Sequence, residues 1–193
     1  MKAIPIAKAA FFKIIFLLII LFFTACGKKE HQKGSLIEKE AFSQNRKQQN
    51  DKDQLEASFF IATANVSNAI ISKSQIAQKR SESKIQDLSK KIENHQSQLL
   101  QTISEMANKK LIIITDINAI HKKDLYELTD TNDTTFAKTY LSSIAESLSE
   151  QIKLFEKISA ETNDEKILKL VLQYLPEQYQ LLRETERIQT EFY

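Results

Sequence analysis

Three histidines and a single cysteine are the side chains of this 193-residue chain best suited to ligate a transition metal or attack a substrate. A di-metal site inside a helical bundle takes a Glu from two helices and a Glu-x-x-His motif from each of two others. No Glu-x-x-His occurs in the sequence. Glu93 and His95 are two residues apart, which turns them to different sides of a helix. His31 and His121 lie in segments that we expect outside the core, so the sequence predicts no metal and no other cofactor.

Nucleophilic and phosphate-binding chemistry has no motif in the chain either. Its two glycines are Gly27 and Gly34, which excludes both a Gly-x-Ser-x-Gly elbow and a glycine-rich phosphate loop. The Lys and Arg pairs are spread among acidic residues, which is typical of solvated helix faces. We therefore expect a protein that is not an enzyme.

The N-terminal 25 residues have the order of a secretory signal. Lysines come first, an apolar run of ten residues follows over 14–23, and small residues precede Cys26. Ten helical residues rise only ~15 Å, about half of a bilayer core, so a permanent span is the weaker interpretation.

Residues 23–26, Phe-Thr-Ala-Cys, resemble a bacterial lipobox, with Phe23 where Leu is usual. The resemblance implies cleavage after Ala25 and acylation of Cys26, which would hold the protein on a membrane through two or more lipid chains. The alternative is an ordinary secreted protein with one free thiol. Because Gly27 rather than Asp follows the cysteine, we expect the outer membrane rather than the inner one.

Removal of the signal changes the charge of the protein. The formal net charge of +2 becomes about −1, because the mature chain keeps 24 basic and 25 acidic residues. The sequence therefore predicts no nucleic-acid binding.

The mature chain divides into a tether and one helical domain. Residues 26–53 are polar, contain both mature glycines and predict a lipidated, flexible tether, although a short helix near 35–49 is an alternative. Residues 54–193 lack glycine, which argues against the tight turns of a sheet. Apolar residues recur there at helical spacing in four stripes: Leu55 to Ile76, Ile85 to Met106, Phe136 to Ile158 and Ile167 to Phe192.

These stripes predict an all-α fold, an up-down four-helix bundle. Expected N-caps are Asp53, Ser81, Asp133, and Asn163 or Asp164. The connector 109–132 between the second and third helices is expected to be irregular, with an extended crossing over 111–115 and a short helix over 119–128.

Two residues interrupt the helical pattern. Pro176 lies inside the fourth helix and predicts a kink near 173–175. Lys73 lies in the first stripe, where it either extends from the bundle edge to solvent or pairs with an acid on a neighbouring helix.

The order and spacing of the helices resemble the domain of unknown function 4142 family, a bacterial envelope family with a ferritin-like four-helix fold. The resemblance covers about 59–188. It rests on Phe59-Phe60 with Ile76-Ala77, Glu93-Asn94-His95, Phe136-Ala-Lys-Thr-Tyr140 with Phe155-Glu156, and Leu175-Pro176.

The family pattern has a Glu, an Asp-His pair and two further histidines, which look like an inward-facing metal or proton site. By position they fall on Ile70, Asn94-His95, Leu148 and Leu181, so only His95 is retained. Asn94 and His95 are the candidate buried polar site. We expect His95 to be a core histidine bonded to a tyrosine or serine; the alternative is a remnant of the family site or a pH-sensitive switch.

Three functions follow as hypotheses. The first is a non-enzymatic envelope lipoprotein that binds a protein partner or has a structural part. The second is a ferritin-like metal or redox protein, and the third is a bundle that binds a small molecule or lipid. The oligomeric state is not determined by the sequence.

Overall fold

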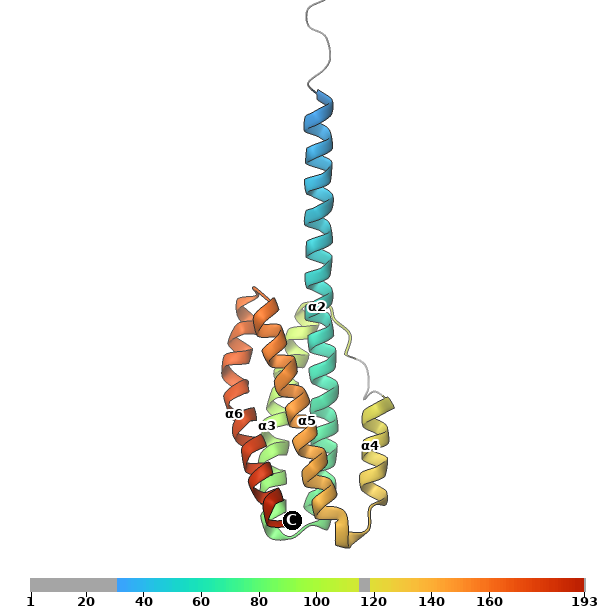
Figure 1. The fold of residues 1–193 in the computed structure, drawn as a ribbon, viewed down its shortest axis with the longest axis vertical. Coiled ribbons are helices and arrows are strands. Elements are labelled where there is room, and N and C mark those ends of the chain that lie inside the picture. The colour runs from blue at the N-terminus through green and yellow to red at the C-terminus, as the bar shows by residue number, and fades with distance from the viewer. Residues whose placement is uncertain (1–30, 115–118, 193) are drawn as a thin grey trace, which may run out of the picture. The chain divides into compact units, whose positions relative to one another are not determined.

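A computed structural model of the protein describes residues 31–114 and 119–192 (Figure 1). The predicted signal peptide and Cys26 lie outside the described residues. The described part is all-helical, as predicted, and has no strand. Its elements are α2 (His31–Arg80), α3 (Ser83–Lys109), α4 (Ala119–Asp130), α5 (Asp133–Glu161), α6 (Glu165–Gln189) and the 3-10 turn η1 (Thr190–Phe192). Among the described helices, none is both long and apolar enough to cross a bilayer.

The chain divides into two compact units at Gln49 and Asn50, and each unit is described by itself. In the first unit, helix α2 begins at His31 rather than at the predicted cap Asp53. Within 35–49 most residues are Lys, Gln, Glu, Ala or Leu, which favour helix, and none is proline. The role of 26–53 as a tether stays a prediction.

In the second unit the four long helices do not alternate in direction. Gln96 bonds Gln151 and Ser89 lies beside Tyr140, so residue numbers rise together and α3 runs parallel to α5. Lys73 contacts Ser147, whereas the earlier Ser67 bonds Gln151, so α2 runs antiparallel to α5. The predicted up-down alternation is therefore wrong (Figure 1).

The physical reason lies in the connector between α3 and α5. At one end of the bundle, Lys110 donates to Glu56 and Asp164, so the end of α3 lies beside the start of α6. At the other end, Arg80 donates to the Thr131 carbonyl and to Asp133, where α5 begins. Helix α4 lies alongside the bundle and leads to the end at which α5 starts (Figure 1).

Two apolar clusters form the core of this unit. One includes Ile70, Ile92, Leu148 and Leu181, and the other includes Phe59, Phe155 and Tyr174. Each Å² of apolar surface buried in these clusters stabilises the fold by about 25 cal/mol, and this burial holds the helices together.

Side-chain capping sets two of the helix starts. Asp164 accepts from the backbone N–H groups of Lys166 and Ile167, which confirms one of the two predicted caps of α6. Asn132 caps α5, one residue before the predicted Asp133. Glu82 occupies the N-cap position of α3 with no side-chain hydrogen bond, so the predicted Ser81 is wrong by one residue.

The connector combines an irregular segment with a helix, as predicted. Residues 111–114 have no regular structure; Leu111 and Ile113 are exposed, whereas Ile112 and Ile114 pack partly against the core. Thr115 lies outside the described residues. Helix α6 continues through Pro176, and the kink there stays a prediction.

Candidate functional site

Three apolar side chains close the interior of the bundle where the family resemblance led us to expect replaced polar positions. Ile70, Leu148 and Leu181 come from three helices, have 0% exposure and belong to one cluster. These side chains have no proton to exchange and no lone pair for a metal. The centre of the bundle at this level is therefore an apolar core.

His95 is buried beside this core with 5% exposure, but the predicted hydrogen bond is not formed. Neither ring nitrogen has a hydrogen-bond partner among the described residues. The ring meets Tyr174 edge-on with 5.6 Å between centroids, and Nε2 lies 3.8 Å from Glu177 Oε2. Burial lowers the pKa of His95, and the Glu177 charge opposes this shift. Asn94 is exposed, so it does not share a buried polar site with His95.

An amide layer that the sequence did not reveal crosses the bundle at the level of His95. We use this name for Ser67, Gln96 and Gln151, which are 0% exposed. Gln96 Nε2 donates to Gln151 Oε1 over 2.6 Å, and Gln151 Nε2 donates to Ser67 Oγ over 2.8 Å. The sequence did indicate that Gln96 is buried. It stands four residues after Ile92 and three before Leu99, which is the spacing of a core position. The layer is neutral, which suits hydrogen bonding and register rather than acid–base chemistry.

A second buried polar group surrounds Tyr140. Its hydroxyl lies 2.8 Å from Ser89 Oγ and 3.4 Å from Ser74 Oγ, and Tyr140 has 0% exposure. Burial raises the pKa of Tyr140, so the phenol stays protonated and its bonds are those of a neutral group. These contacts join α2, α3 and α5 near the end of the bundle that Arg80 closes.

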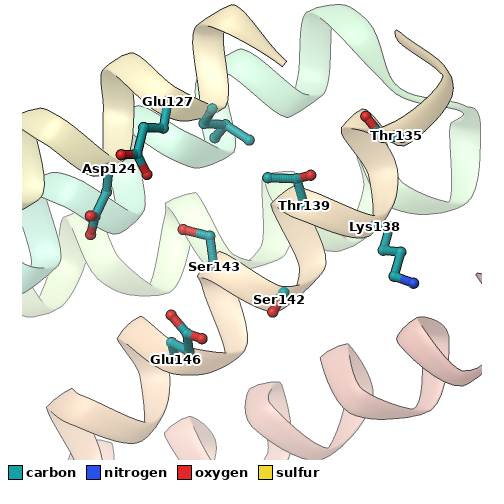
Figure 2. Close-up of a pocket in the computed structure, with 9 residues that line it drawn as sticks. Asp124, Glu127, Thr135, Lys138, Thr139, Ser142, Ser143 and Glu146 are labelled. Carbon is teal, nitrogen blue, oxygen red and sulfur yellow. The ribbon is translucent and has the colours of Figure 1, made fainter. Parts of the chain in front are cut away.

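A pocket with a volume of about 580 Å³ lies between α4 and α5. Figure 2 shows Asp124 and Glu127 on α4 facing the hydroxyl side chains of α5. The lining is mixed: three carboxylates, four hydroxyls, one lysine and one leucine, from Asp124, Glu127, Leu128, Thr135, Lys138, Thr139, Ser142, Ser143 and Glu146. Such a lining offers hydrogen bonds and negative charge to a polar molecule.

Lys73 positions the α4 side of this pocket. The Lys73 side chain is 1% exposed, and its Nζ lies 3.6 Å from Asp124 Oδ2 and donates to Ser147 Oγ over 3.0 Å. Of the two interpretations of Lys73, pairing with an acid on a neighbouring helix is the one that forms. Burial lowers the pKa of Lys73, while Asp124, Glu146 and Glu150 oppose the shift. His121, which we expected outside the core, is also buried here, with Nδ1 4.0 Å from Asp124 Oδ2.

A lysine next to a serine could form a Ser–Lys nucleophile, in which the serine donates its proton to the lysine. In this protein the lysine donates to the serine. Ser147 Oγ donates to the Ser143 carbonyl over 2.9 Å and accepts from Lys73 Nζ. A nucleophilic serine must instead give its proton to the base. The Lys73–Ser147 contact is therefore a positioning contact that joins α2 to α5.

Arg80 holds the other end of α4. Its guanidinium donates to the carbonyls of Thr129 and Thr131 over 3.0 and 2.6 Å and to Asp133 over 2.7 Å. It also lies over the Phe136 ring, 4.3 Å from the centroid. Planar, charge-assisted contacts of this kind are strong and directional. Together with Lys73, Arg80 fixes the wall of the pocket that α4 provides.

No group of three or more His, Cys, Asp or Glu side chains is placed to hold a metal ion within 31–114 and 119–192. The described residues build an apolar interior with two neutral polar groups, a buried lysine paired with Asp124, and a polar surface pocket.

Fold and site therefore define an all-helical domain. A model of the domain of unknown function 4142 family matches residues 41–188. The chain belongs to this family. Neither a curated protein nor a solved structure gives a significant match.

Proposed function

We propose that this protein is an envelope lipoprotein, anchored by lipid on Cys26, whose helical domain is a non-enzymatic binding module. The observation that carries the binding role is the α4–α5 pocket, whose wall is held by the contact of the buried Lys73 with Asp124. A pocket built from carboxylates and hydroxyls suits recognition of a polar or cationic partner group, and a protein of the envelope is the partner that we propose.

The anchor is supported by the sequence around Cys26. An apolar run and small residues precede the cysteine, and Gly27 after it favours the outer membrane. The net charge of about −1 without the signal gives no support to nucleic acid as a partner.

Metabolic labelling with a clickable fatty acid tests the anchor. Wild type should take up the label, and Cys26→Ala should not. Ser35→Ala serves as the control for expression and export, and should label like wild type. Label on Cys26→Ala would refute the anchor.

Capture of partners from detergent-solubilised envelopes tests the binding role. Wild type should retain a reproducible protein partner, and the charge reversals Glu127→Lys and Glu146→Lys should release it. Glu165→Lys, at an exposed acid on α6 outside the pocket, is the matched control. A partner held equally by the pocket variants, or no reproducible partner for wild type, would contradict the proposal.

The ferritin-like arrangement is part of the same proposal. A single long crossover between the second and third helices of a bundle is the connectivity of ferritin-like folds, and α3 and α5 run parallel as that connectivity requires. A metal or redox role remains the alternative function. Elemental analysis of the purified protein tests it, since stoichiometric metal would favour the alternative.

A further inference from the structure

Five polar atoms on α3 and α6 are buried without a hydrogen-bond partner among the described residues. They are both ring nitrogens of His95, Oε1 of Gln96, and both amide atoms of Gln178. The three side chains have 5%, 0% and 0% exposure, respectively. In folded proteins about nine in ten or more of such buried groups have a partner, either protein or ordered water.

The pairing of the two helices brings these atoms to one level. Glu177 on α6 lies 3.8 Å from His95, and the Tyr174 ring contacts the His95 ring. Gln178 follows Glu177 and stands one helical turn after Tyr174, on the buried face of α6. The Lys91–Glu184 contact, earlier on α3 and later on α6, shows the same antiparallel direction. Gln178 therefore faces α3 at the level of His95 and Gln96.

The chemistry of the five atoms defines what can satisfy them. An amide N–H₂ donates, two amide oxygens accept, and a neutral imidazole offers one donor and one acceptor. Burial lowers the pKa of His95, which favours this neutral form. A partner must therefore donate and accept in the same small space and carry no charge.

We propose that ordered water binds between α3 and α6 at His95, Gln96 and Gln178. A buried water makes about three hydrogen bonds, so about two waters would satisfy the five atoms. Gln96 already belongs to the amide layer, and the waters extend that layer to Gln178 on α6. All four long helices are then joined at one level by hydrogen bonds.

The sign of one mutational effect tests the site. Gln178→Leu keeps a similar volume but removes two of the five atoms. If water bonds these atoms, the variant leaves the water and its other partners with too few hydrogen bonds. The Tm of the full chain should then fall by roughly 3–6 °C. If the Gln178 amide has no partner at all, the substitution removes an unpaired buried group and should raise Tm, which would overturn the proposal.

Thr63→Val is the matched control. Thr63 Oγ1 is also buried without a hydrogen-bond partner among the described residues, but it stands on α2, one helical turn before Ser67, and is not one of the five atoms. This near-isosteric substitution should leave Tm unchanged or raise it. An equal loss of Tm in Thr63→Val and Gln178→Leu would count against a specific water site.

A high-resolution crystal structure of the wild-type chain gives a direct answer even if Gln178→Leu does not fold. Solvent density within hydrogen-bond distance of Gln178 and Gln96 is expected. A direct bond between Gln178 and His95, no density, or density for a larger molecule would each refute the proposal.

Discussion

Lys73 on α2 and Asp124 on α4 form a salt bridge of 3.6 Å in which the lysine side chain is 1% exposed and the aspartate side chain is 38% exposed. The lysine thus carries its charge into the bundle, while its partner stays in contact with water. Ser147 accepts a second bond from the same ammonium. Three helices meet at this one side chain, which is why the α4–α5 pocket depends on it.

Removal of the two partners of this salt bridge should have unequal effects. Asp124→Asn leaves a buried ammonium with a weaker partner and should lower the free energy of unfolding by about 1–3 kcal/mol, less than for a fully buried pair because water screens Asp124. Lys73→Met replaces the buried charge by an apolar side chain of similar length and should be nearly neutral. Urea unfolding at neutral pH measures both. A larger loss for Lys73→Met would contradict the assignment.

His95 should make stability depend on pH. Burial lowers its folded-state pKa, so below about pH 6.5 the unfolded chain binds more protons than the folded one. The contribution of His95 to stability is therefore complete above about pH 6.5 and is lost as the pH falls through the folded pKa. The free energy of unfolding of His95→Gln should decline less between about pH 7 and 5. His31→Gln, in the other unit, should follow wild type; equal slopes for all three proteins would refute this prediction.

Truncation of a core leucine should destabilise the protein. Leu148→Ala removes a 0%-exposed side chain and should lower the free energy of unfolding by about 2–5 kcal/mol, as a cavity forms that the helices fill only in part. Leu172→Ala, at a 75%-exposed position on α6, should change it by no more than about 0.5 kcal/mol. Denaturant titration measures both variants. Similar losses would mean that Leu148 is not a core residue.

The Tyr140 hydroxyl should contribute through its contacts with Ser89 and Ser74. Tyr140→Phe keeps the ring, including its stacking on Phe136, but removes the hydroxyl. We expect a loss of about 1 kcal/mol, the usual net value of one hydrogen bond. Tyr126→Phe is the control, because Tyr126 is 73% exposed and its substitution should be neutral. An unchanged stability of Tyr140→Phe would contradict the hydrogen-bonded role.

The apolar spacing alone predicted most of the helices, because burial of one face dictates a period near 3.6. Ile92, Leu148 and Leu181 were placed in the core on this basis, and each is buried. Helix direction could not be predicted in the same way. An apolar stripe looks the same in a helix that runs up or down, so the parallel pair α3 and α5 depended on the path of the connector.

The candidate site, like the fold, could be predicted from the sequence only in part. The sequence identified His95 as a core residue, since it stands near Ile92 and Leu99 on one face. It did not identify Gln96, Gln151 or Gln178, because a polar residue at a core position has no visible partner until helices far apart in the chain are packed together. Burial and pairing are properties of that packing.

By itself, the sequence determined an all-helical domain and a core without the metal-ligand motif of a di-metal bundle. Only the tertiary structure decided that Lys73 pairs with Asp124, that α4 and α5 enclose a polar pocket, and that His95 lies beside Tyr174 and Glu177. The physical reason is that periodicity along one helix reports which face is buried, whereas a salt bridge or a pocket depends on the distance between two helices. That distance is set by the packing of the whole domain.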